Sequence, residues 1–170
     1  VRPFGTGDAL PVVEVDQLNF NAAQTWSPDG RTLAVTMQLP SGYQGVYLVA
    51  INGSTPPRQL TPDRGSAFFP SWSPDGEWIA FSWSPVANSE IWRLPVTGET
   101  TLVTGEMPQP ERLTFDFNAD TAPRYSPDGA WIAFETGRDD NTEIYLLPAN
   151  PVPLDGASPA EIETQAESNL

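Results

Sequence analysis

Three oxygen-bearing side chains stand at alternate positions in the segment Asp116-Phe-Asn118-Ala-Asp120. Carboxylate and amide oxygens bind Ca²⁺, and this alternate spacing opens the calcium loop of an EF-hand. That loop also needs a glycine at its sixth position and a glutamate at its twelfth, where this chain has Thr121 and Pro127. An EF-hand is therefore excluded. A calcium site of another type stays open, and no other cofactor is expected.

Further carboxylates, together with two arginines, gather in segments that connect predicted strands. Two carboxylates that lie close together can act as the acid and the base of a hydrolytic reaction. Such residues are also common on the loops of an acidic protein, where they are solvated or have a structural role, and we favour this second interpretation. The residues are Asp16, Asp63, Asp116, Asp120, Asp139, Asp140, Arg64 and Arg138.

Aromatic residues occur in the same connecting segments. Aromatic side chains beside arginine are typical of the residues that dominate protein–protein interfaces. Alternatively the phenylalanines fill the core, where we also expect Trp26, Trp72 and Tyr125. The aromatic residues are Tyr43, Phe68, Phe69, Trp83, Phe115 and Phe117. The candidate binding residues that we select from these segments are Tyr43, Asp63, Arg64, Trp83, Asp116, Asn118, Asp120, Arg138, Asp139 and Asp140.

Several kinds of catalysis are excluded by residues that the chain does not contain. It has no His and no Cys, and all eight of its basic residues are Arg. Ser-His-Asp triads, thiol nucleophiles, lysine Schiff bases and P-loops all need one of the missing residues. We therefore predict no catalytic residues and a protein that is not an enzyme, although hydrolysis by carboxylates alone is not strictly excluded.

The predicted strands that flank these connecting segments belong to a sequence repeat that occurs three times. Trp-Ser-Pro-Asp-Gly occurs at 26–30 and 72–76 and returns as Tyr-Ser-Pro-Asp-Gly at 125–129. Each copy is followed by an apolar run and then by a second apolar strand, as in Ile-Ala-Phe and Glu-Ile-Trp. The proline, aspartate and glycine suit a tight hairpin turn. Repeats of this length built from short strands predict the blades of a β-propeller.

The repeats divide the chain into one all-β domain over residues 1–164 and a flexible tail over 165–170. We predict four-stranded antiparallel blades at about 21–61, 67–114 and 120–164, and an extra outer strand at 12–15 that belongs to a preceding blade. The segments with the candidate residues join the second strand to the third and the fourth strand to the next blade. In a propeller both kinds of connection lie on one face, so we expect the candidate residues there.

The repeat resembles that of the TolB-like β-propellers, whose consensus combines Pro-x-Trp-Ser-Pro-Asp-Gly with Ile-Ala-Phe, Glu-Ile-Tyr and Leu-Thr. Residues 123–147 match it best, and the first repeat departs from it at Gln24 and Gly45. The resemblance implies a place outside the cytoplasm, periplasmic or extracellular. Members of this family usually close rings of about six or more blades. We therefore expect a protein partner or a second copy to complete the three blades, unless the chain is part of a longer one.

Charge narrows the remaining classes of function. The chain has 22 acidic and 8 basic residues and a net charge of −14, which excludes a basic patch for nucleic acid. No apolar run reaches the roughly 18 residues of a membrane span, so we expect no direct membrane insertion. We predict a non-catalytic interaction module or accessory subunit of a larger assembly. Two alternatives stay open: the propeller domain of a prolyl-oligopeptidase-like peptidase or other hydrolase, and a propeller that binds calcium or a small ligand.

Overall fold

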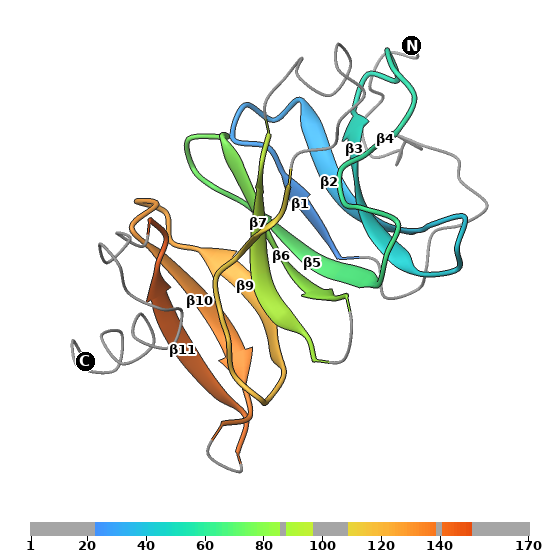
Figure 1. Cartoon of the computed structure of the whole chain (residues 1–170). Coiled ribbons are helices and arrows are strands. Elements are labelled where there is room, and N and C mark those ends of the chain that lie inside the picture. Colours follow the sequence, from blue (N-terminus) through green and yellow to red (C-terminus); the bar gives the residue numbers. More distant parts are fainter. Residues whose placement is uncertain (1–22, 86–87, 97–108, 139–140, 151–170) are drawn as a thin grey trace.

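The computed structural model describes residues 23–85, 88–96, 109–138 and 141–150 (Figure 1). These residues form strands and connecting segments without a helix, and the strands make three antiparallel sheets. The sheets lie side by side in chain order, and β1 and β9 both contact β5, so the first strands of successive sheets come together. The predicted fold class, a partial β-propeller, is confirmed.

Each sheet follows the chain order of its strands. The first contains β1 (Gln24–Trp26), β2 (Thr32–Gln38), β3 (Gln44–Ala50) and β4 (Arg58–Gln59). The second contains β5 (Ser66–Trp72), β6 (Trp78–Ser84), β7 (Glu90–Pro95) and β8 (Glu111–Arg112). The third contains β9 (Asp120–Tyr125), β10 (Trp131–Thr136) and β11 (Glu143–Pro148). The extra strand predicted at 12–15, the fourth strand of the third repeat and the tail at 165–170 lie outside the described residues.

The turn between the first two strands of each sheet is built in the same way three times. In the first sheet the Ser27 hydroxyl donates to Asp29 Oδ1 at 2.6 Å, and this oxygen also accepts the Arg31 amide at 3.0 Å. The hydrogen bond from Ser27 is the main reason why the pKa of Asp29 lies below its usual value. Gly30 takes a φ of 67°, which side chains other than glycine rarely adopt. The motif is thus a hairpin turn, as predicted.

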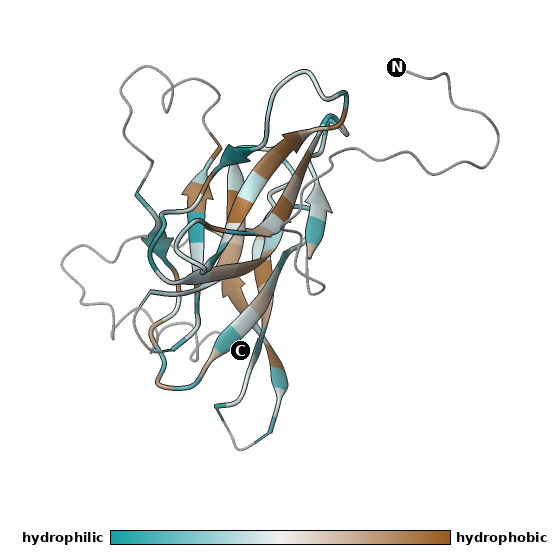
Figure 2. Ribbon diagram, turned by 90° about the vertical axis from the view of Figure 1, so that its right-hand side faces the viewer, coloured by the Kyte–Doolittle hydropathy of each residue, from teal (hydrophilic) through white to brown (hydrophobic). Residues whose placement is uncertain are grey.

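Two apolar contact layers, which we call the first and second seams, join the sheets. In the first seam Ala34 and Val46 of the first sheet pack with Phe81 of the second. In the second seam Ala80 of the second sheet packs with Ile132 of the third. Since side chains alternate along a strand, the middle sheet is apolar on both faces. Figure 2 shows the apolar residues concentrated in the long strands and the hydrophilic ones in the connecting segments.

The turns of successive sheets also stack on one another. A Cβ atom added to Gly76 would lie 3.7 Å from the Pro28 ring, and one added to Gly129 would lie 3.5 Å from the Pro74 ring. The glycine of each later turn therefore packs on the proline of the turn before it. This repeated contact extends the seams to the turn end of the sheets.

Hydrogen bonds cross the second seam as well. The Tyr125 amide donates to the Ser71 hydroxyl at 3.1 Å, and the Ala122 amide donates to the Ser82 hydroxyl at 3.0 Å. Burial raises the pKa of Tyr125 to about 12, so its phenol is neutral at physiological pH. Arg93 reaches across from the second sheet and donates to the Ala149 carbonyl at 2.6 Å. The second seam therefore combines apolar packing with polar contacts.

Several aromatic predictions need correction. Phe68 and Phe69 were expected in a connecting segment, but they lie inside β5. Trp26 was expected in the core, but 56% of its surface is exposed. Its counterparts Trp72 and Tyr125 pack against the first and second seams, each facing the sheet before its own. Trp26 belongs to the first of the described sheets, where no earlier described sheet can cover it. Trp83 was expected in an exposed loop, but it lies inside β6 with 1% of its surface exposed.

Candidate functional site

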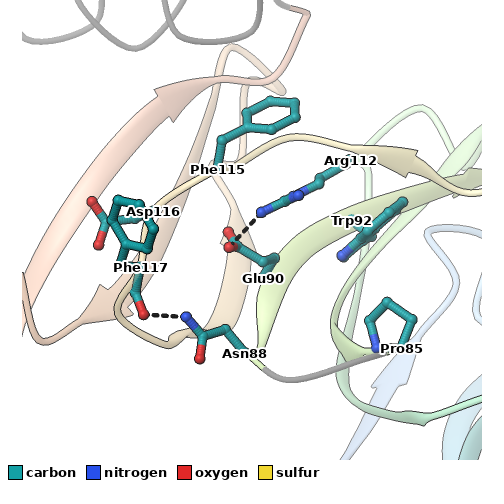
Figure 3. Close-up of a pocket in the computed structure, with 8 residues that line it drawn as sticks. All are labelled: Pro85, Asn88, Glu90, Trp92, Arg112, Phe115, Asp116 and Phe117. Atoms are coloured by element: carbon teal, nitrogen blue, oxygen red, sulfur yellow. Dashed lines mark hydrogen bonds and ion pairs between the residues drawn. The ribbon is translucent and has the colours of Figure 1, made fainter.

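A pocket of about 310 Å³ opens between the segment after β6 and the segment after β8 (Figure 3). These are a second-to-third and a fourth-to-next connection, the two kinds of connection that we expected on one face. Charged, amide and aromatic side chains surround the pocket. Its lining residues are Pro85, Asn88, Glu90, Trp92, Arg112, Phe115, Asp116 and Phe117.

A partly buried ion pair forms one wall of the pocket. Arg112 donates to Glu90 Oε1 at 2.6 Å, and the Thr114 hydroxyl donates to Glu90 Oε2 at 2.7 Å. The Glu90 side chain is only 4% exposed, whereas that of Arg112 is 36% exposed. Burial raises the pKa of Glu90, and the bonds from Thr114 and Arg112 oppose this effect. The ion pair therefore holds a carboxylate in a place that would otherwise favour its neutral form.

The Arg112 guanidinium is fixed in position by further contacts. Its Nε donates to the Thr114 carbonyl at 2.7 Å. The guanidinium carbon lies 4.7 Å from the centre of the Phe115 ring and 6.0 Å from that of Trp92, within the range of cation–π attraction. The geometry of Arg112 is thus set before any ligand arrives, which lowers the entropy lost on binding.

An exposed aromatic ring stands at the rim of the pocket. Phe117 is 95% exposed, and the Asn88 amide donates to its carbonyl oxygen. On the inner side, the indole nitrogen of Trp92 is buried and has no hydrogen-bond acceptor among the described residues. The pocket therefore combines the exposed ring of Phe117, whose burial by a ligand would be favourable, with the fixed guanidinium of Arg112.

Four of the predicted residues come together beside the pocket around Arg138. Arg138 contacts Asp120 at 2.9 Å and Asp116 at 3.7 Å. Asp120 is fully buried, and its amide donates to the Ser89 carbonyl at 2.8 Å. Asp116 accepts the Asn118 amide at 2.7 Å, which closes a local turn. Asp116, Asn118, Asp120 and Arg138 thus form one cluster.

The calcium prediction concerned these same carboxylates. In the structure they face the guanidinium of Arg138, so a cation from the chain itself already lies between them. Over the described segments, no group of three or more His, Cys, Asp or Glu side chains is placed to hold a metal ion. The arrangement is that of an ion-pair network.

The other predicted residues lie near the first seam. The Ser41 hydroxyl donates to Asp63, and Tyr43 is 50% exposed in the same connection. The Arg64 guanidinium lies 5.5 Å from the Trp83 ring, whose indole nitrogen donates to the Arg64 carbonyl at 3.0 Å. Trp83 is therefore a core residue that supports Arg64. Asp16, Asp139 and Asp140 lie outside the described residues.

The buried Trp83 connects this region to the pocket. Its ring lies 4.8 Å from that of Trp92 in an edge-to-face arrangement. Trp92 in turn lines the pocket, so the supporting side chains of the two groups are packed on each other. The candidate residues are thus spread along one face, with the pocket at the connections of the second sheet.

Sequence reasoning missed Glu90, Trp92 and Arg112, because the repeats assign them to strands. One signal was available in a comparison between repeats. Gln59 of the first sheet donates to the Thr61 carbonyl at 2.8 Å, as Arg112 donates to that of Thr114. The first repeat, however, has Gly45 where the second has Glu90. The pairing of Glu90 with Arg112 therefore has no counterpart in the first repeat.

Comparisons with known proteins place this architecture among TolB-like propellers. No family model matches the chain. An uncharacterized protein of Agrobacterium fabrum, Atu1656, is 30% identical over 143 residues, which are 82% of this chain and 42% of that protein. A protein assigned as a TolB from Agrobacterium tumefaciens superposes with a TM-score of 0.63 and 27% identity, over 80% of this chain and 43% of its own.

Two further structures are similar at greater distance. TolB of Acinetobacter baumannii has a TM-score of 0.61 and 27% identity, over 74% of this chain and 29% of its own. A prolyl endopeptidase shares the fold with a TM-score of 0.50 and 15% identity, over 74% of this chain and 20% of its own. The chain has a TolB-like fold and spans less than half of these relatives. The described residues include no helix long and apolar enough to cross a membrane.

Proposed function

We propose that the chain is a non-catalytic interaction module that binds a segment of a protein partner at the pocket in Figure 3. The observation that carries this proposal is the fixed Glu90–Arg112 ion pair beneath the rim where Phe117 is 95% exposed. Interfaces draw most of their binding free energy from a few aromatic and arginine side chains in such settings. The similarity to TolB structures supports a place outside the cytoplasm, in a larger assembly.

The contacts between the charged groups of the pocket favour a binding role over a catalytic one. Its charged groups are bound to one another, with Arg112 on Glu90 and Arg138 on Asp116. A general acid and base would instead need to reach a substrate or a water molecule. The full sequence also lacks His, Cys and Lys. We therefore infer a binding role and no catalysis by this chain.

A selection of displayed peptides against the chain tests the binding role. We expect the selected peptides to bind Phe117→Ala at least tenfold more weakly, because the substitution removes the exposed ring from the rim. Tyr43→Ala is the matched control, since Tyr43 is also an exposed aromatic residue on this face but lies outside the pocket. Isothermal titration measures each affinity. Equal binding by both variants, or no enriched peptide, would contradict the proposal.

A second candidate is the propeller domain of a peptidase whose catalytic residues lie on another part of the polypeptide. The fold shared with a prolyl endopeptidase favours it. In that case the chain itself hydrolyses neither peptide nor glycoside substrates, as in the first proposal. Peptides that bind at the Phe117 rim support the interaction module, whereas failure of that selection leaves the peptidase domain as the better account.

A further inference from the structure

The pocket and the neighbouring Arg138 cluster contain one carboxylate more than their guanidinium groups pair closely. Glu90 contacts Arg112 at 2.6 Å, and Asp120 contacts Arg138 at 2.9 Å. Asp116 lies 3.7 Å from Arg138, which is beyond the distance of a hydrogen bond. Among the described residues of this region, three carboxylates therefore share two guanidinium groups, and the loosely paired carboxylate is Asp116.

The Asp116 side chain is fixed by one of its oxygens and keeps the other available. Oδ1 accepts the Asn118 amide at 2.7 Å, which holds the carboxylate in its place. Within the described part of the chain, the contact of Oδ2 is the long one to Arg138, and the side chain is 25% exposed. Asp116 also lines the pocket. Its Oδ2 can therefore accept hydrogen bonds from a ligand.

Two neighbours of Asp116 extend this side of the pocket. Asn88 Nδ2 donates to the Phe117 carbonyl, which leaves Asn88 Oδ1 as a further acceptor. The Phe117 ring is 95% exposed. Figure 3 shows Asn88, Asp116 and Phe117 on the same side of the pocket. An aromatic face attracts a cation, and the aliphatic stem of lysine or arginine can cover an exposed ring.

The opposite side of the pocket carries a positive charge instead. Arg112 and Trp92 lie there, and the Arg112 side chain is 36% exposed. Neither the guanidinium nor the indole nitrogen of Trp92 can accept a hydrogen bond. A cationic ligand group is therefore directed to the side with Asp116. An anionic group would meet this carboxylate and the net charge of −14 of the whole chain.

We propose that the partner segment contributes an arginine or lysine side chain to the pocket. Its stem packs on the Phe117 ring, and its charged head donates to Asp116 Oδ2 and Asn88 Oδ1. This inference rests on the proposed function and adds the chemical class of the ligand to it. A basic side chain fits because it combines an apolar stem with several donors and the opposite charge.

Titration with N-acetyl-arginine amide, followed by two-dimensional ¹⁵N NMR, tests this subsite without a selected peptide. At about 10 mM we expect the probe to shift the amide signals of Asn88, Phe117 and Asn118, as a weakly bound single residue should. N-acetyl-glutamine amide has no charge, and its shifts should be at least about fivefold smaller. Equal shifts from the two probes would overturn the proposal.

Two substitutions that remove the same charge complete this titration. Asp116→Asn keeps an oxygen for the Asn118 amide but should abolish most of the difference between the probes. Asp63→Asn is the matched control, because Asp63 is exposed and lies outside the pocket, and it should preserve the difference. An unchanged response of Asp116→Asn would overturn the assignment of this carboxylate.

The displayed peptides separate this inference from the proposed function. We expect each binding peptide to contain an arginine or lysine whose replacement by glutamine weakens binding about fivefold, the upper range for a partly exposed ion pair. The loss should shrink as sodium chloride rises from about 0.02 to 0.5 M, because salt screens the pair. Peptides that bind through Phe117 without a basic residue would overturn this inference and leave the proposed function intact. If no peptide is enriched, the proposed function fails, and the titration still decides on the basic subsite.

Discussion

At the scale of single residues, Arg112 takes part both in the strand architecture and in the ion pair that lines the pocket. Its bond to the Thr114 carbonyl repeats the bond that Gln59 makes to Thr61, so this contact belongs to the strand architecture. Its ion pair with Glu90 has no counterpart in the first sheet, where Gly45 replaces the glutamate. A Cβ added to Gly45 would come within 2.8 Å of the Leu39 side chain, so a glutamate at this position would require Leu39 to shift.

This difference leads to a prediction for Arg112→Gln. The glutamine can keep the bond to Thr114 but removes the charge next to the buried Glu90. We expect the variant to be about 2 kcal/mol less stable at pH 7, somewhat less than for a fully buried pair because Arg112 is 36% exposed. Urea unfolding at several pH values measures the loss.

The pH dependence of this loss follows from the raised pKa of Glu90. Without Arg112 the pKa in the folded state rises further above that in the unfolded state. The stability difference between the variant and the wild type is therefore smallest below pH 4.5, the usual pKa, where Glu90 is protonated in both states. It grows as the pH rises through the folded-state pKa. Glu90→Gln with Arg112→Gln should recover most of the loss, and an unchanged deficit would contradict the account.

The sequence predicted that Asp116, Asp120 and Arg138 share a face, but it predicted neither their ion pairs nor the pocket next to them. Asp116 lies in a connection, and Asp120 is the first residue of β9 in a segment that the repeat assigns to the same connection. Glu90 stands in the strand motif Glu-Ile-Trp, whose equivalent Glu143 in Glu-Ile-Tyr is exposed. The burial of Glu90 depends on what the following segment places over it. A repeat pattern cannot contain that information, because it describes what the copies share.

At the scale of elements, an alanine occupies the same position in all three second strands. Ala34 and Ala80 are 0% exposed in the first and second seams, where a small side chain lets the sheets approach each other closely. Ala133 occupies the same position in the third sheet, on the side away from the second seam, and is partly exposed. The strand pattern is therefore the same in all three copies, and the neighbouring sheet decides whether the position is buried.

These equivalent alanines provide a prediction about packing. Ala80→Leu should destabilise the chain by about 2 kcal/mol, because the second seam has no space for three more carbon atoms. Ala133→Leu should cost under about 0.5 kcal/mol in the single chain, since its side of the third sheet is open. Thermal unfolding of dilute samples measures both. A loss of equal size at the two positions would show that the third sheet is covered within the chain.

At the scale of the whole molecule, the propeller architecture could be predicted because turn chemistry and strand alternation repeat in register. The exposure of Trp26 could not be predicted from the same pattern. The motif assigns the same residue type to the same position in the first two repeats, and 46 residues later Trp72 is packed in a seam. Only position within the arc separates the two tryptophans, since a first sheet has no described sheet before it.

The stacking of Gly76 on Pro28 and of Gly129 on Pro74 has a consequence for how such chains change in length. The turn of each repeat carries a proline on which the glycine of the next repeat packs, so successive repeats have matching surfaces. Duplication of one whole repeat therefore inserts a unit that is already matched to both neighbours, whereas an insertion of half a repeat disrupts two contacts at once. A gene for this architecture can grow or shrink in steps of one blade, and selection then acts on the number of blades rather than on each new interface.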